Sequence, residues 1–105
     1  MKSIIQLSPS DAYEHIQKGA LLLDVREVYE TKELRCDIPH AIYIPMSQFQ
    51  DKIQILPKDK EIITICYSGA RSYVATQILN ASGYTNTANV TGGIVAWKNE
   101  GLPIK

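Results

Sequence analysis

Glu61-Ile-Ile-Thr-Ile-Cys66-Tyr-Ser-Gly-Ala-Arg71-Ser72 is the segment from which the rest of the chain is interpreted. Its first half is a β-branched run that is typical of a strand buried on both faces. The run stops at Cys66, and Tyr67 to Ala70 form a short turn that contains a glycine. From Ser72 to Ser82 apolar residues recur at helical spacing. The segment therefore predicts a strand, a tight loop and a helix, with a thiol as the first loop residue and Arg71 as the last.

This placement has chemical consequences for the thiol. A loop that leads into a helix N-terminus points several backbone N–H groups into one concavity, and the helix dipole adds partial positive charge there. Such a site favours the thiolate of Cys66, since the pKa of a free cysteine is about 8.5. Arg71 adds a cation whose forked donors suit oxyanions. A cysteine that ends a buried strand can also be an inert small hydrophobe. The combination with a glycine and an arginine, where α/β sheets place ligands, favours an activated cysteine facing an anion.

Length and composition limit the class of protein. The 105 residues predict one domain over 1–105, with a core that needs no disulfide or metal. Eleven basic residues balance 11 acidic residues without a basic run, which argues against nucleic-acid or membrane-surface binding. No apolar stretch approaches the ~20 residues of a membrane span, and the N-terminus lacks a signal-peptide pattern. We therefore expect a cytoplasmic protein. The spacing of its two cysteines and two histidines does not suggest a metal site.

Other predicted strands alternate with helices along the chain. Ser8, Pro9 and Asp11 mark a helix start, as N-cap, first helical position and third helical position. His15 in this helix and the charges of the segment 27–34 are expected to be solvated. The pattern places strands at 4–6, 21–25, within 38–45 and at 87–90, and further helices at 27–34, 46–53 and from 94. This order predicts a three-layer α/β fold with about five mainly parallel strands and helices on both faces.

Four motifs carry a family resemblance. They are Leu23-Asp24-Val25-Arg26-Glu27, the segment from Ile38-Pro39 to Ile44-Pro45, the loop from Cys66 to Ser72, and Gly92-Gly93-Ile94-Val95-Ala96-Trp97. In this order and spacing the chain resembles a single-domain rhodanese-like protein over nearly its whole length. One region departs from the family pattern. The usual Gly-His-Ile-Pro-Gly-Ala is replaced by Cys36-Asp37-Ile38-Pro39-His40-Ala41, and the segment before it is about two residues longer.

The resemblance implies a sulfurtransferase of the thiosulfate:cyanide type that needs no cofactor. Cys66 would take the outer sulfur of thiosulfate or another persulfide donor, become a persulfide, and pass the sulfur to cyanide or a thiol. Arg71 would hold the donor anion. The cradle for the terminal sulfur would comprise Tyr67, Ser68, Gly69, Ala70 and Ser72, with Tyr67 and Ser68 shaping the choice of acceptor. Asp24 and Arg26 would support the loop from beneath. A sulfur-relay protein is a possible partner.

Two other functions remain open at this stage. The chain could be a protein-to-protein sulfur carrier or regulatory module with little free turnover. It could also be a cysteine phosphatase or arsenate reductase, although those phosphatases place five residues between cysteine and arginine and this chain places four. Cys36 is either an incidental thiol or a resolving cysteine that attacks the Cys66 persulfide. The physiological sulfur donor and acceptor and the oligomeric state are not indicated by the sequence.

Overall fold

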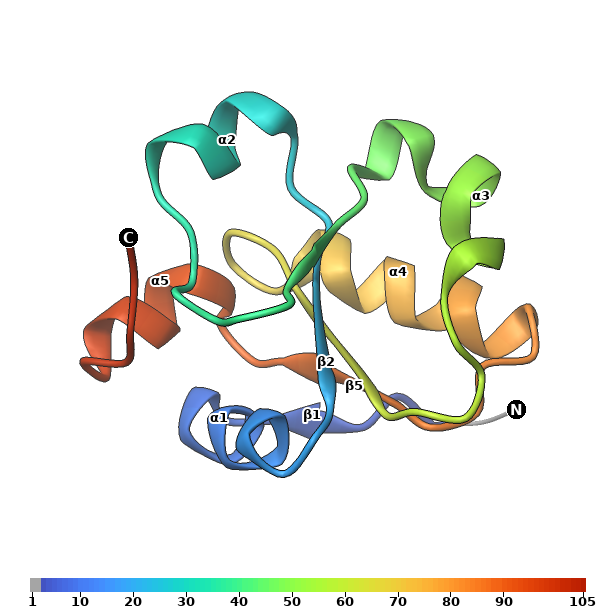
Figure 1. Cartoon of the computed structure of the whole chain (residues 1–105), viewed down its shortest axis with the longest axis horizontal. Helices are drawn as coiled ribbons and strands as arrows, with labels where there is room; N and C mark the ends of the chain where they lie inside the picture. Colours follow the sequence, from blue (N-terminus) through green and yellow to red (C-terminus); the bar gives the residue numbers. More distant parts are fainter. Residues whose placement is uncertain (1–2) are drawn as a thin grey trace.

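The computed structural model describes residues 3–105 and contains one five-stranded sheet in the order β1-β5-β4-β2-β3 (Figure 1). All four strand pairs are parallel. The strands are β1 (Gln6–Leu7), β2 (Leu21–Asp24), β3 (Ile42–Tyr43), β4 (Ile62–Ile65) and β5 (Thr87–Val90). The expected α/β architecture is confirmed, and β4, the third of the five strands in this order, is buried along its whole length.

Helices cover both faces of the sheet, as expected. On one face α1 (Pro9–Gln17) and α5 (Gly93–Asn99) contribute Ala12 and Trp97 to a core with Ile63 and Ile65 of β4. On the other face pack α3 (Phe49–Lys52) and α4 (Ala70–Ala81), whose Leu79 meets a core that includes Ile62. Alternate residues of β4 thus pack into the cores on opposite faces of the sheet, as the two-residue period of a strand requires.

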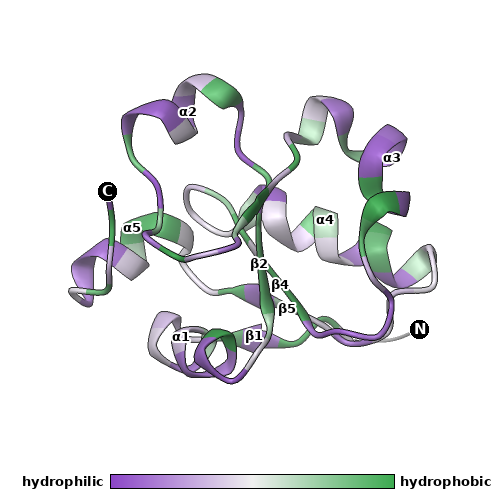
Figure 2. Ribbon diagram, in the orientation of Figure 1, coloured by the Kyte–Doolittle hydropathy of each residue, from purple (hydrophilic) through white to green (hydrophobic). Residues whose placement is uncertain are grey.

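The remaining helix, α2 (Val28–Glu33), lies beyond the end of β2, at the end of the sheet formed by the C-termini of the strands (Figure 1). Figure 2 shows β2 and β4 as hydrophobic, whereas most of α2 is hydrophilic. The position of α2 matters for function, since ligands of parallel α/β sheets bind outside the carboxyl ends of the strands. No helix within residues 3–105 has the length and apolar content to cross a membrane.

Several boundaries differ from the prediction. The helix expected over 46–53 is one α-turn, α3, between 3-10 turns at Met46–Gln48 and Ile53–Ile55. The hydroxyl of Tyr84 lies 2.7 Å from the Ile53 carbonyl oxygen and 3.0 Å from that of Leu56, so it holds the turn that follows α3. The first strand lies at 6–7 instead of 4–6.

The helix predicted from Ser72 to Ser82 also differs in its bounds. Helix α4 begins at Ala70, so Arg71 is its second residue and not the last residue of the loop. Gly69 makes this early start possible, because its φ of +104° is open to glycine and its carbonyl accepts a hydrogen bond from the Tyr73 N–H at 3.1 Å.

In α1 the expected capping is confirmed, since the Ser8 hydroxyl accepts from the Asp11 N–H at 3.1 Å. His15 is not simply solvated: its Nδ1 pairs with Glu61 at 2.9 Å.

Candidate active site

Cys66 follows β4 directly, and the N-terminus of α5 holds its loop. The N–H of Ile94 donates to the Cys66 carbonyl oxygen at 2.8 Å, and the N–H of Val95 donates to that of Tyr67 at 3.2 Å. Gly93 permits this approach, because its φ is +60° and an added Cβ would lie 2.5 Å from the Cys66 carbonyl oxygen. Gly93, which belongs to the fourth motif of the family resemblance, therefore allows α5 to hold the cysteine loop. Because these two carbonyls face α5, loop N–H groups are left to face the sulfur.

The sulfur is surrounded by hydrogen-bond donors. The Gly69 N–H lies 3.1 Å from the Cys66 Sγ, and the Ser72 hydroxyl lies 3.3 Å from it. Burial is the largest single influence on the pKa of the thiol and raises it. The Ser72 hydroxyl and the N–H groups of Ser72, Gly69 and Ser68 together outweigh burial, so the pKa of Cys66 is lowered. The structure thus supplies the thiolate-stabilising cradle that the sequence predicted.

A side chain from β5 determines how Ser72 is placed. The Ser72 hydroxyl lies 2.5 Å from the Asn89 Oδ1, and the Asn89 Nδ2 donates to the Gly69 carbonyl at 3.2 Å and to the Gln6 Oε1 at 3.0 Å. Ser72 has one proton for its acceptors, so Asn89 and the cysteine sulfur share it. Sequence reasoning missed Asn89. The available signal was a polar amide inside a strand that is otherwise apolar or β-branched.

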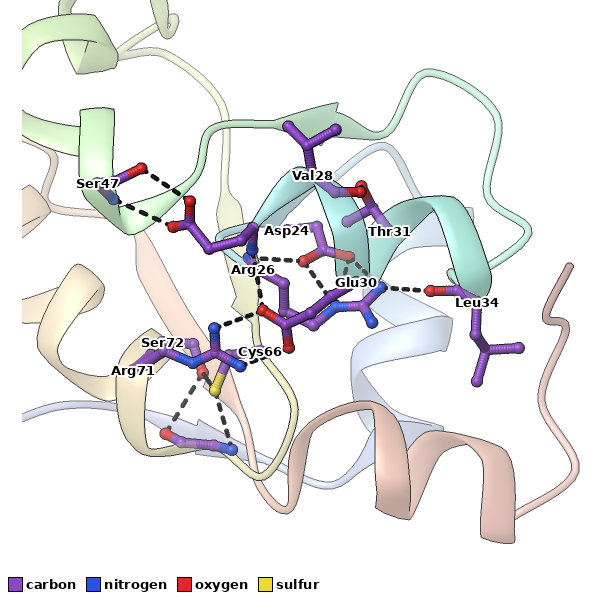
Figure 3. A network of polar contacts seen from close by, with 12 residues as sticks. Asp24, Arg26, Val28, Glu30, Thr31, Leu34, Ser47, Cys66, Arg71 and Ser72 are labelled. Atoms are coloured by element: carbon purple, nitrogen blue, oxygen red, sulfur yellow. Dashed lines mark hydrogen bonds and ion pairs between the residues drawn. The ribbon is translucent and has the colours of Figure 1, made fainter.

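Arg71 is paired with a carboxylate from α2 (Figure 3). Its Nη1 and Nη2 donate to the two oxygens of Glu30 at 2.7 and 2.8 Å. The hydrogen bond with Arg71 lowers the pKa of Glu30 to about 2, and the same contact raises the pKa of Arg71. The expectation that the charges of 27–34 are solvated is wrong for Glu30, and also for Glu27, which accepts from the Ser47 hydroxyl at 2.8 Å.

This pairing changes what Arg71 can offer to an anion. A guanidinium has five N–H donors, and Glu30 uses only two of them. The others have no partner among residues 3–105 and can still bind an oxyanion. The pair as a whole is neutral, however, so it attracts an anion less strongly than a free arginine would.

Asp24 and Arg26 form a buried ion pair. The Arg26 Nη2 lies 2.9 Å from the Asp24 Oδ2, and the Nε lies 3.1 Å from the Oδ1. The same Nη2 donates to the Leu34 carbonyl oxygen at 2.7 Å. Within residues 3–105 these side chains make no hydrogen bond to the cysteine loop, so the expected support from beneath is not present. The pair instead joins the end of β2 to the end of α2, which keeps Glu30 over the site.

Cys36 lies in a different environment from Cys66. It belongs to the core on the α1 and α5 face, whereas Cys66 belongs to the opposite core, and both are free thiols. Burial, and secondarily the charge of Asp24, raises the pKa of Cys36 to about 12. A buried thiol that stays protonated does not attack a persulfide, so the structure argues against a resolving role for Cys36. Within residues 3–105 no group of His, Cys, Asp or Glu side chains is arranged to hold a metal ion.

A pocket of about 430 Å³ lies beside the cysteine loop. Its walls come from α2, the loop and α5, and comprise Arg26, Tyr29, Glu30, Glu33, Leu34, Tyr67 and Ile94. Cys66 itself is only 1% exposed. The thiol is therefore shielded from bulk water, and the pocket lies at its side.

These features define a class of protein: an α/β fold in which a thiolate-stabilising loop at the end of the central parallel strand presents one cysteine beside a pocket. Comparisons with known proteins narrow the class. The family model for the rhodanese-like domain matches residues 8–100. The chain therefore belongs to the rhodanese-like domain family, which confirms the resemblance seen in the sequence.

Individual relatives include proteins named as sulfurtransferases. A sulfurtransferase of Allochromatium vinosum is 40% identical over 83% of this chain and 79% of that protein. The thiosulfate sulfurtransferase GlpE of Haemophilus influenzae is 30% identical over 97% of this chain and 95% of that protein. The crystal structure of a rhodanese-related protein from Thermoplasma volcanium has a TM-score of 0.87 and 38% identity, and covers 96% of this chain and 97% of that one.

Proposed function

We propose that this protein is a sulfurtransferase that uses Cys66 as a persulfide carrier, with thiosulfate or another persulfide as donor. The observation that carries the proposal is the cradle around the Cys66 Sγ, in which the Gly69 N–H and the Ser72 hydroxyl favour the thiolate. The names of the relatives support sulfur transfer as the reaction class.

The reaction consists of two displacements at sulfur. The Cys66 thiolate attacks the outer sulfur of thiosulfate, and the S–S bond of thiosulfate breaks with its electron pair leaving on sulfite. The acceptor then attacks the outer sulfur of the Cys66 persulfide, and the electron pair of that bond returns to Cys66 as thiolate. Cyanide gives thiocyanate, and a thiol gives a persulfide. The cradle assists both steps, because it stabilises Cys66 as nucleophile and as leaving group.

The N–H donors that Arg71 does not use for Glu30 are available to the donor anion. Tyr67 lies in the wall of the pocket beside the loop. The free N–H donors of Arg71 therefore offer a position for the donor anion, and the pocket offers a position for the acceptor.

Intact mass and thiocyanate release test the proposal. Wild type and the matched variants Cys66→Ser and Cys36→Ser are incubated with thiosulfate and then with cyanide. We expect wild type and Cys36→Ser to gain one sulfur atom, lose it to cyanide and release thiocyanate, and Cys66→Ser to do neither. A Cys66 thiol that never gains sulfur from thiosulfate or polysulfide would refute the proposal. Hydrolysis of an aryl phosphate that requires Cys66 would support the phosphatase alternative.

Two observations favour a second function, that of a sulfur carrier between proteins. Cys66 is almost fully enclosed and Arg71 is neutralised by Glu30, so free thiosulfate is only weakly attracted to the site. A carrier predicts a persulfide that is stable to cyanide and is discharged by a protein thiol. The intact-mass experiment separates the two functions, because the enzyme loses its sulfur to cyanide.

A further inference from the structure

We propose that the pocket beside the loop is the sulfur-acceptor site and that Glu33 selects its occupant, a peptide cysteine flanked by an apolar and a basic residue. This inference rests on the proposed sulfurtransferase function. It goes further because it assigns a chemical class to the acceptor and a specificity role to a residue outside the cysteine loop.

The position of the pocket connects it to the chemistry. Tyr67, the residue after the nucleophile, forms one wall, and Ile94, whose N–H holds the Cys66 carbonyl, forms another. Glu30, which pairs with Arg71, contributes from α2. An acceptor in this pocket is therefore close to the loop that would carry the persulfide.

The volume and surface of the pocket fit more than a small anion. A space of about 430 Å³ falls in the range of pockets that hold organic ligands, and it far exceeds the size of cyanide. Tyr29 is 73% exposed and Tyr67 is 57% exposed, so two aromatic side chains stand at the site without covering partners. Exposed aromatic side chains beside a pocket are typical of surfaces that bind peptides. Leu34 and Ile94 complete the apolar lining.

The charges that line the pocket determine which charge its occupant should carry. Arg26 is neutralised by Asp24, and Glu30 is neutralised by Arg71. Glu33 lies in an exposed position of α2, and its side chain has no ion pair or hydrogen bond among the described residues 3–105. The lining thus carries one uncompensated negative charge. A thiol in a basic segment is attracted to it, and a thiol with carboxylates is repelled.

The transfer step balances without an external oxidant. The acceptor thiol loses its proton to solvent, and its thiolate attacks the outer sulfur of the Cys66 persulfide. The bond between the two sulfur atoms of the persulfide breaks, and its electron pair returns to Cys66. The acceptor leaves as a persulfide, so one sulfur atom has moved and the protein is ready for another donor.

Single-turnover discharge to two matched peptides tests the inference. The protein is loaded with thiosulfate or polysulfide, freed of donor, and mixed with acetyl-Phe-Cys-Lys-amide or acetyl-Phe-Cys-Glu-amide, and loss of sulfur is followed by intact mass. We expect the lysine peptide to be the better acceptor by about fivefold in kcat/KM at low salt, with a smaller ratio at high salt. Acetyl-Gly-Cys-Lys-amide should be a poorer acceptor than its phenylalanine counterpart.

Variants of Glu33 assign the preference to the pocket. Glu33→Gln should bring the ratio between the two charged peptides near one, and Glu33→Lys should reverse it. Asp59→Asn is the matched control, since Asp59 is an exposed carboxylate in the segment that precedes β4, at the N-terminal end of that strand and away from the pocket. It should retain the wild-type ratio. Equal discharge to both peptides, or a ratio that Glu33→Lys leaves unchanged, would overturn the inference. Failure of wild type to load sulfur would instead refute the proposed function.

Discussion

Replacement of Ser72 by alanine tests the physical basis of the site, the stabilisation of a thiolate by the cysteine loop. The Ser72 hydroxyl lies 3.3 Å from the Cys66 Sγ and also 2.5 Å from the Asn89 Oδ1. A hydrogen bond to a charged group contributes about 1.5–3 kcal/mol. Because Ser72 shares its proton with Asn89, we take the lower end, about 1.5 kcal/mol, which corresponds to about a tenfold change in the population of thiolate.

The assay is the rate of alkylation of Cys66 by iodoacetamide as a function of pH, in a Cys36→Ser background. Below the titration midpoint we expect Ser72→Ala to react about tenfold more slowly than the parent, because less of its thiol is ionised. On the alkaline plateau the two rates should agree within about twofold, since ionisation is complete in both. Thermal unfolding of each variant establishes that the fold is retained. Ser82→Ala, at the exposed end of α4, is the matched control and should leave the profile unchanged.

Two results would refute this reasoning. An identical pH profile for Ser72→Ala and its parent would mean that the hydroxyl does not stabilise the thiolate. A decrease of the same size at every pH would mean that the substitution changes access to the sulfur and not its ionisation. Either result would remove the link between the geometry of the loop and the proposed persulfide chemistry.

Three other substitutions have expected outcomes. Glu30→Gln leaves the charge of Arg71 uncompensated, so the KM for thiosulfate should fall by about fivefold at low salt, an effect of about 1 kcal/mol. The pKa of Glu30 is lowered from 4.5 to about 2 in the folded protein, so ionised Glu30 stabilises the fold fully above pH 4.5, and this stabilisation is lost as the pH falls towards 2. The free energy of unfolding of Glu30→Gln should therefore lack this part of the pH dependence. Gly93→Ala should prevent α5 from holding the cysteine loop and abolish turnover, because the added Cβ meets the carbonyl oxygens of Cys66 and Tyr67 and φ is +60°. An active, stable Gly93→Ala would contradict this role. Arg26→Ala should cost about 3–5 kcal/mol in denaturant unfolding, since it leaves the Asp24 carboxylate buried and unpaired; a loss below about 1 kcal/mol would contradict it.

The fold was predictable because its signals are local. A run of β-branched residues followed by an apolar helical period is contained within one segment, and the strand expected at 87–90 lies at those residues. The same holds for the start of α1, where Ser8 and Pro9 act through neighbours three residues away or fewer. The segment 46–53, where the predicted helix is wrong, is held at its end by a residue far away in the sequence. The hydroxyl that ties down Ile53 belongs to Tyr84, 31 residues along the chain.

The cysteine site divides in the same way. The loop donors, from Ser68 to Ser72, lie within six residues of Cys66 and could be read from the motif. Glu30 could not, because its partner Arg71 is 41 residues away and a charged exposed helix is the ordinary interpretation of its surroundings. Asn89 is 17 residues from Ser72. Only the parallel order of the strands brings these side chains together.

The same division separates the groups that stabilise the sulfur from the groups proposed to select its donor and acceptor. The groups that stabilise the sulfur are mainly backbone N–H groups, which most substitutions leave in place. The groups proposed to act on the donor and the acceptor are side chains. Arg71, with its partner Glu30, would act on the donor and Glu33 on the acceptor, and a single substitution neutralises or reverses each of these charges. Changes in α2 should therefore alter which molecules give and receive sulfur while the ionisation of Cys66 stays nearly constant. If Glu33→Lys shifted the alkylation profile of Cys66 as strongly as Ser72→Ala, the separation between chemistry and specificity would be wrong.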